Sequence, residues 1–244
     1  MPKFFVTSKQ LKEKDVIIQG EDVNHIKNVL RKKAGDLLNI SITDIKKDCV
    51  VEIETLTEQK VICKIKEYTD ANTEPSIKVT IFQGLPKSDK MELIIQKAVE
   101  LGVYDIYPVN MERCIVKLKD KEKKLSRWQK ISEVASKQSG RSIIPEVKSC
   151  IEIKDICNFI SQYDKIIVAY EEEKQNTLKL ELKKINSDIK KIGIVIGPEG
   201  GIDKKEIEIL KRSGANIVTL GNRILRTETV ALNILSCIMY EFEQ

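Results

Sequence analysis

The sequence has little that supports a metal site or a histidine-based active site. It contains one histidine, His25, and six cysteines among 244 residues. No two cysteines have C-x-x-C spacing, so a zinc site is not supported and we expect no metal. A triad in which histidine activates a nucleophile is poorly supported as well. Several cysteines stand inside apolar runs, which predicts reduced thiols in the core.

Long apolar runs are also missing, and the chain does not open with a charged segment followed by an apolar one. We therefore expect no membrane segment and a soluble, cytoplasmic protein. No G-x-G-x-x-G follows a predicted strand, and no G-x-x-x-x-G-K-[ST] occurs. A Rossmann-type cofactor site and a P-loop NTPase are thus not supported.

Charge is abundant in both signs, with a net charge of +5 and 32% charged residues. The positive excess lies in residues 111–141, whereas residues 1–70 are nearly neutral. This basic stretch contains Trp128, which we expect in the core. Its lysines form either a solvated helix face or a patch for a polyanion, and we favour the patch.

Two domains are predicted, joined by a polar, turn-rich linker over residues 71–76. Residues 1–70 contain short strands typical of a small β-barrel, with one helix over 21–31. Residues 77–244 alternate strands and helices, which predicts a parallel sheet and an α/β domain. The strands expected in the two domains are 4–6, 15–18, 37–40, 50–53 and 61–65, then 77–82, 105–109, 166–169, 192–196 and 217–220. The helices expected in the second domain are 90–101, 126–139 with Ser126 as its cap, 176–185, one beginning near the capping-box pair Asp203 and Glu206, and 228–242.

Two glycine-bearing loops follow predicted strands near the C-terminus, at 196–201 and 220–229. Ligands bind where the strands of an open α/β sheet end and its helices begin. We therefore interpret the loops as walls of one binding site. A tight connection without a ligand explains a single glycine-rich turn equally well. The second loop favours a site, because Arg223, Arg226 and Glu228 stand between apolar stretches, where charges need partners.

Several motifs in this order resemble the RsmE family, SPOUT-superfamily methyltransferases that act on N3 of a uridine in small-subunit ribosomal RNA. The motifs span most of the chain. They are Gly84-Leu85-Pro86-Lys87-Ser88-Asp89-Lys90-Met91-Glu92, Glu100-Leu101-Gly102, Glu112-Arg113-Cys114, Arg127-Trp128, Gln138-Ser139-Gly140-Arg141, Gly197-Pro198-Glu199-Gly200-Gly201 and Leu220-Gly221-Asn222-Arg223-Ile224-Leu225-Arg226-Thr227-Glu228-Thr229. Two departures are small: Ser88 and Val230 stand where glycine and alanine are expected.

The resemblance implies a PUA-like, RNA-binding β-barrel before a SPOUT-type parallel-sheet domain tied in a trefoil knot. It implies S-adenosylmethionine as the cofactor, a homodimer, and 16S ribosomal RNA or the small subunit as the substrate, with the uridine near the decoding centre. The cofactor-binding residues it implies are Ala169, Tyr170, Ile196, Gly197, Gly200, Leu220, Gly221, Ile224, Leu225, Arg226 and Thr229. The residues we expect at RNA are His25, Arg31, Lys87, Lys90, Arg113, Lys117, Arg127 and Arg141.

Methylation at N3 requires loss of the uridine proton, and therefore a base or a cation that stabilises the anion. Arg226 is the first candidate for the cation. Glu228 is a candidate for orienting Arg226 or accepting the proton, and a purely structural Arg226–Glu228 ion pair is an equal alternative for Glu228.

Two other functions stay open from the sequence. One is a non-catalytic RNA-binding protein for ribosome assembly that keeps the SPOUT fold. The other is an enzyme that uses the glycine-rich loop for a phosphorylated small molecule, against which the basic 111–141 stretch argues.

The charge pattern predicts that binding to ribosomal RNA weakens steeply with salt. Neutralising several phosphates releases counterions, so the affinity should fall on the order of tenfold or more between 50 and 200 mM salt. Filter binding over a salt series measures this. An affinity that stays flat over that range would contradict a phosphate-gripping surface.

Overall fold

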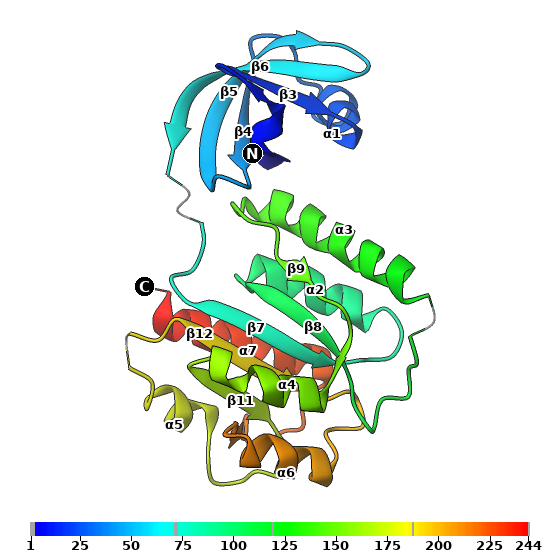
Figure 1. Cartoon of the computed structure of the whole chain (residues 1–244), viewed down its shortest axis with the longest axis vertical. Helices are drawn as coiled ribbons and strands as arrows, with labels where there is room; N and C mark the ends of the chain where they lie inside the picture. Colours follow the sequence, from blue (N-terminus) through cyan, green and yellow to red (C-terminus); the bar gives the residue numbers. More distant parts are fainter. Residues whose placement is uncertain (1–2, 71–72, 119, 187, 244) are drawn as a thin grey trace. The chain divides into compact units, whose positions relative to one another are not determined.

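The computed structural model describes residues 3–70, 73–118, 120–186 and 188–243. Contacts divide the chain into two units. Unit 1 comprises Met1–Glu74 with Ser136–Ile144, and unit 2 comprises Pro75–Ala135 with Pro145–Gln244. The division at Glu74 and Pro75 falls inside the predicted linker, of which residues 71 and 72 lie outside the described residues. Figure 1 shows both units, which we describe separately.

Unit 1 is built on a six-stranded sheet in the order β1-β4-β5-β6-β3-β2. β1 runs parallel to β4, and the other neighbours are antiparallel. The strands are β1 (Lys3–Val6), β2 (Leu11–Lys12), β3 (Asp15–Gln19), β4 (Leu37–Ile42), β5 (Lys47–Leu56) and β6 (Lys60–Thr69). Alternating residues of β4 and β5, such as Ile40 and Val51, are fully buried, so one face of the sheet forms the core.

The helix predicted over residues 21–31 is present but is not a continuous α-helix. α1 (Glu21–Asn24) passes into a π-helical segment, His25–Val29. Val23 and Ile26 are buried in the core of unit 1. Arg31 then takes a φ of 51°, which ends the helical turn.

Residues 136–144 belong to unit 1 and are held there by buried polar contacts. The sequence predicted a first domain made of one continuous segment, residues 1–70, which does not contain them. The Lys3 ammonium donates to the Asp48 carboxylate at 2.6 Å and to the Ser142 hydroxyl at 2.9 Å. The Ser142 hydroxyl donates to the same Asp48 oxygen at 2.6 Å. Arg141 and Glu74 form a further ion pair at 2.5 Å.

Unit 2 contains a sheet in which every pairing is parallel, in the order β10-β8-β7-β12-β11-β13, with β9 also pairing with β8. The strands are β7 (Lys78–Gly84), β8 (Asp105–Asn110), β9 (Glu146–Val147), β10 (Ile151–Glu152), β11 (Lys165–Ala169), β12 (Lys191–Ile196) and β13 (Asn216–Val218). β7 and β12 lie side by side although a hundred residues separate them in the chain (Figure 1). This confirms the predicted α/β fold with a parallel sheet.

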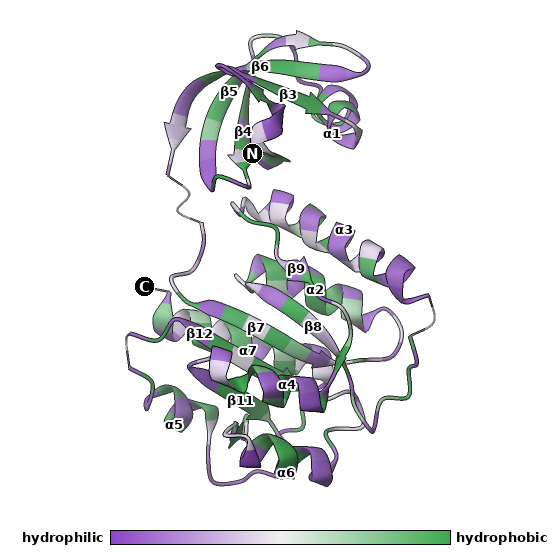
Figure 2. Cartoon of the chain, viewed as in Figure 1, coloured by the Kyte–Doolittle hydropathy of each residue, from purple (hydrophilic) through white to green (hydrophobic). Residues whose placement is uncertain are grey.

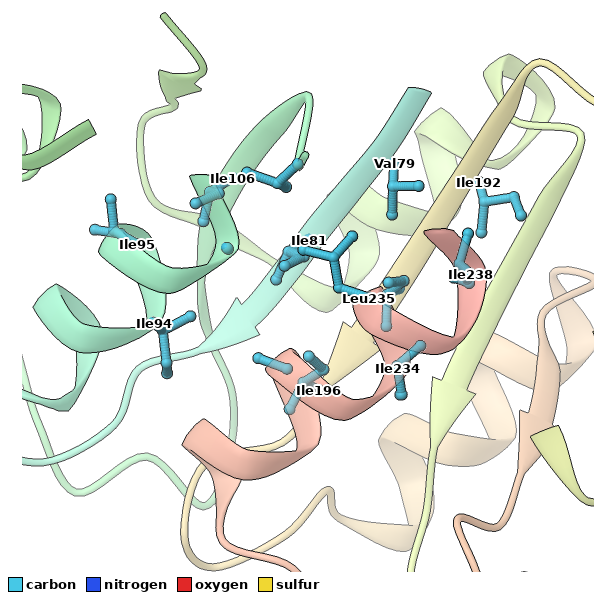
Figure 3. Close-up of a cluster of buried hydrophobic side chains, with 14 of the residues drawn as sticks. Val79, Ile81, Ile94, Ile95, Ile106, Ile192, Ile196, Ile234, Leu235 and Ile238 are labelled. Atoms are coloured by element: carbon cyan, nitrogen blue, oxygen red, sulfur yellow. The ribbon is translucent and has the colours of Figure 1, made fainter. Parts of the chain in front are cut away.

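Side chains alternate between two cores along these strands. Ile192, Ile194 and Ile196 of β12 face one cluster, to which α2, α5 and α7 also contribute. Val195 of the same strand faces the other cluster, with residues of α4 and α6. Figure 3 shows the first cluster, where Ile81 and Ile196 lie near Ile94, Ile234 and Leu235. Figure 2 shows the corresponding strands as mostly hydrophobic, as expected for a sheet buried on both faces.

The helices of unit 2 confirm most of the sequence expectations and correct three. They are α2 (Lys90–Glu100), α3 (Lys121–Ser139), α4 (Ile153–Phe159), α5 (Leu178–Leu182), α6 (Lys204–Arg212) and α7 (Thr227–Phe242), and the last turn of α3 from Ser136 belongs to unit 1. α3 begins before Ser126, which is therefore an interior residue and not a cap. α5 is shorter than expected, with Thr177 as its cap, and the short α4 was not predicted. The Asp203–Glu206 capping box and the burial of Trp128 are confirmed.

The trefoil knot implied by the resemblance stays a prediction, because strand order and pairing do not by themselves describe how the chain is threaded. The order does show that β12 inserts between β7 and β11, and that the chain reaches β13 beyond β11 only afterwards.

The buried contacts of Asp48 predict a large stability effect. Asp48→Ala leaves the Lys3 ammonium without its carboxylate, so we expect the unfolding free energy of unit 1 to fall by about 3–5 kcal/mol. The double variant Lys3→Met/Asp48→Leu removes both charges and should lose much less. Urea unfolding followed by fluorescence and circular dichroism measures both. A double variant that loses as much as the single one would show that the charges are not the cause.

Candidate functional site

One cavity of about 580 Å³ lies in unit 2, where β11, β12 and β13 end at their carboxyl edges. Its walls come from the three segments that follow these strands. They are residues 169–171 after β11, 196–202 after β12 and 219–227 after β13, joined by Lys90, Lys174 and Val230. The two glycine-bearing loops thus form walls of one site, as the sequence predicted.

The loop after β12 is a tight turn packed against neighbouring backbone. The Gly201 N–H donates to the Pro198 carbonyl at 2.9 Å. A Cβ added to Gly84, at the end of β7, would lie 2.7 Å from Pro198, so this approach requires glycine. The Arg113 guanidinium donates to the Gly200 carbonyl at 3.1 Å. The loop is therefore held by contacts with the end of β7 and with Arg113.

Thr227 connects the second loop to the first. Its hydroxyl donates to the Gly197 carbonyl at 2.7 Å and accepts a hydrogen bond of 2.8 Å from the Gln83 side-chain amide. Thr227 and Gln83 are both buried. Neither was singled out from the sequence: Thr227 is part of the quoted motif, but no sequence signal points to Gln83.

The third wall is tied to the second loop by backbone hydrogen bonds. The Tyr170 N–H donates to the Val218 carbonyl at 3.0 Å. Thr219, the residue after β13, pairs with Thr177 in an isolated parallel β-bridge. The loops after β11 and β13 are therefore fixed relative to each other.

Lys90 connects two carboxylates beside the cavity. Its ammonium lies 3.0 Å from a Glu199 oxygen and 3.4 Å from a Glu228 oxygen. The Glu199 bond, aided by Glu228, raises the pKa of Lys90 despite partial burial. Burial raises the pKa of the Glu199 carboxyl, but hydrogen bonds from Lys90 and from the backbone outweigh it, and the net pKa lies below its ordinary value. The two ion pairs of Lys90 thus connect the start of α2 to α7 and to the loop after β12.

The predicted contact between Arg226 and Glu228 is not present. Glu228 pairs with Lys90, whereas Arg226 is exposed on the cavity wall and has no ion pair within the described part of the chain. The reason is geometric: Arg226 precedes α7 in extended backbone, whereas Glu228 lies in its first turn and faces α2.

The structure brings all of the predicted cofactor-binding residues except Thr229 to this cavity. Those at its walls are Ala169, Tyr170, Ile196, Gly197, Gly200, Leu220, Gly221, Ile224, Leu225 and Arg226. Ile224 is 89% exposed, which is unusual for a large apolar side chain beside a cavity. Thr229 lies in the first turn of α7, exposed and away from the cavity walls.

The predicted RNA-binding residues are spread over both units and stay predictions. Arg141 differs from the rest, because it is only 4% exposed and is paired with Glu74. Most of the others are exposed; His25 and Lys90 are partly buried. His25 and Arg31 lie in unit 1, whereas Lys87, Lys90, Arg113, Lys117 and Arg127 lie in unit 2. Arg113 and Arg127 also bind Asp203 and Glu92, respectively.

Within the described ranges, no group of three or more acidic, cysteine or histidine side chains is arranged to hold a metal ion. The same residues include no helix with both the length and the apolarity needed to cross a membrane. All six cysteines are free thiols, and burial raises the pKa of Cys49 to about 11.

The two hydrogen bonds of the Thr227 hydroxyl predict a measurable contribution to the unfolding free energy. Thr227→Val keeps the shape but removes both hydrogen bonds and leaves the buried Gln83 amide with one partner fewer, so we expect a loss of about 1–3 kcal/mol in unfolding free energy. Thr227→Ser keeps the hydroxyl and should lose less. Denaturant unfolding of both variants is the measurement. A loss in Thr227→Val that is no larger than the loss in Thr227→Ser would mean that the two hydrogen bonds contribute no more than the methyl contact.

Family models match both parts of the chain. An RNA methyltransferase domain matches residues 73–239, and an RNA methyltransferase PUA domain matches residues 18–66. The match to the first extends over most of unit 2 and includes all three loops of the cavity.

Individual proteins with similar sequences or structures support the same family. The chain is 39% identical to ribosomal RNA small subunit methyltransferase E of Bacillus subtilis, over 100% of this chain and 98% of the relative. A crystal structure of the protein of that name from Neisseria gonorrhoeae, bound to S-adenosylmethionine, has a TM-score of 0.88 at 30% identity, covering 99% and 98% of the two chains. A putative methyltransferase from Legionella pneumophila, in complex with the same cofactor, has a TM-score of 0.84 at 27% identity, covering 98% and 96%. The chain therefore belongs to the ribosomal RNA small subunit methyltransferase E family, with an N-terminal PUA-like domain and a SPOUT-type methyltransferase domain.

Proposed function

We propose that this chain transfers the methyl group of S-adenosylmethionine to N3 of a uridine in 16S ribosomal RNA, near the decoding centre. The observation that carries the proposal is the cavity that the loops after β11, β12 and β13 form together. The full-length similarity to relatives named as small-subunit ribosomal RNA methyltransferases supports the substrate.

The residues of the cavity fit the cofactor. Its volume of about 580 Å³ is within the range of small-molecule sites, and its walls combine apolar side chains with glycine-bearing loops. Leu220 and Leu225 offer apolar surface for an adenine ring. A Cβ added to Gly221 would meet nothing within 4 Å, so the second loop leaves space beside them. S-adenosylmethionine supplies a methyl group on a positively charged sulfur.

N3 of the base gives up its proton to solvent water, and the chain has to place this nitrogen and stabilise its negative charge. Placement in line with the donor accounts for much of the rate in such transfers. The Arg226 guanidinium, exposed at the cavity and unpaired among the described residues, is suited to stabilise the uridine anion. Lys90 also lies at the cavity, but its charge is balanced by Glu199 and Glu228, and we assign Glu228 the role of holding Lys90.

The target base must leave its stack to reach the cavity. We propose that unit 1 and the exposed cations of residues 111–141 hold the surrounding phosphates. A homodimer and a cytoplasmic location are further proposals, which rest on the family resemblance.

The alternative is a non-catalytic RNA-binding protein for ribosome assembly with the same fold. The intact cavity and Arg226 argue against it, since an assembly factor does not need a cofactor site. Calorimetry with S-adenosylmethionine separates the two: a protein that binds RNA but no cofactor would support the alternative.

Arg226→Ala should abolish detectable methylation, with a loss of roughly 10²–10³-fold or more, while cofactor binding is kept. The reason is that the anion at the acceptor base loses its stabilising cation. Incorporation of labelled methyl groups into small subunits, followed by mass mapping of the RNA, measures activity, and calorimetry measures cofactor binding. Arg212→Ala, on the exposed face of α6, is the control. Turnover like that of the wild type in Arg226→Ala would refute the assignment.

A further inference from the structure

Three consecutive glutamates follow β11, and two of them have structural roles. Glu172 pairs with Lys204 at 3.0 Å. Glu173 accepts backbone hydrogen bonds from residues 174–176, which lower the pKa of its carboxyl. Glu171 is different: within the described residues its carboxylate has no hydrogen bond or ion pair, and it lines the cavity. A carboxylate placed there without a partner is available to a ligand.

The loop after β12 leaves a place for this carboxylate. Gly201 has a φ of 74°, and a Cβ added to it would lie 2.3 Å from Glu171 Oε1. Any other residue at position 201 would displace the Glu171 side chain. On the backbone side, the Lys174 ammonium donates to the Glu171 carbonyl at 2.9 Å. The carboxylate is therefore packed against the glycine loop while it stays at the cavity wall.

The position of Glu171 indicates which part of a ligand it meets. It belongs to the wall after β11, whereas Lys90, Arg226 and Thr227 come from α2 and the start of α7. In the proposed function the reacting end of the methyl donor lies beside Arg226. The wall after β11 then meets a part of the donor away from the methyl group.

An ionised carboxylate accepts hydrogen bonds with two oxygens and donates none, which suits two neighbouring hydroxyl groups. Acidic side chains bind ribose in this way in dinucleotide-binding folds. We propose that Glu171 binds the ribose hydroxyls of the adenosyl group, so that the site selects ribonucleoside cofactors. The proposal rests on the proposed function and adds a sugar-recognising residue to it.

The experiment measures binding by calorimetry in the full-length chain. The probes are S-adenosylhomocysteine, its counterpart with a deoxygenated ribose, and 5′-methylthioadenosine, which keeps the ribose but lacks the amino acid. The variants are Glu171→Ala and Glu171→Gln, with Glu172→Ala as the matched control on the neighbouring residue. Thermal unfolding confirms that each variant is folded.

We expect Glu171→Ala to weaken S-adenosylhomocysteine and 5′-methylthioadenosine by the same factor, about 10- to 100-fold. The deoxyribose counterpart should bind the wild type more weakly and lose little more in Glu171→Ala, because the hydroxyls and the carboxylate act as a pair. Glu171→Gln, which keeps one acceptor oxygen, should fall between the wild type and Glu171→Ala. Glu172→Ala should leave all three affinities unchanged.

Two results would overturn the assignment. Weaker binding of S-adenosylhomocysteine with unchanged binding of 5′-methylthioadenosine would mean that Glu171 pairs with the ammonium group of the amino acid. Unchanged binding of both probes would mean that Glu171 meets only solvent. In either case the wild type still binds the probes, whereas a wild type that binds none of them would overturn the proposed function itself.

Discussion

The parallel pairing of β12 with β7 on one side and β11 on the other is the constraint on which the site depends. Parallel strands end at the same edge of a sheet, so the segments after β11, β12 and β13 emerge next to one another. β12 is buried on both faces, and its isoleucines and valine pack into two separate cores. A shift of its register by one residue would exchange these faces and would also move the glycine loop away from its neighbours.

Polar contacts then convert this proximity into a defined cavity. Thr227 joins the second loop to Gly197 and to Gln83 at the end of β7. Lys90 joins α2 to the glycine loop and to α7. These contacts are at least partly buried, where a hydrogen bond that loses its partner is costly. Among the described residues, Arg226 and Glu171 line the cavity without an ion pair, so their charges are available to substrate and cofactor.

The sequence predicted most strands and the loops of the cavity, because the signals for them lie in short stretches of neighbouring residues. Apolar runs identified the central strands, and glycines together with a capping box identified the loop before α6. The π-helical segment after α1, the short α4 and the true start of α3 were missed, since short or irregular helices have weak periodicity. Arg141 reads as one more cation of a basic stretch, and only the fold shows it buried against Glu74.

By itself, the sequence determined that the chain has a β-rich part followed by a parallel α/β part, and that two glycine-bearing corners, the second with Arg226, form walls of one cavity. Periodicity and turn chemistry depend on neighbours in the chain, so they can be read without coordinates. Only the tertiary structure decided which charges are paired. Glu228 forms an ion pair with Lys90 and not with Arg226, and Glu172 forms one with Lys204. Glu171 lines the cavity. Ion pairs form between residues far apart in sequence, and their partners are set by which strands lie side by side.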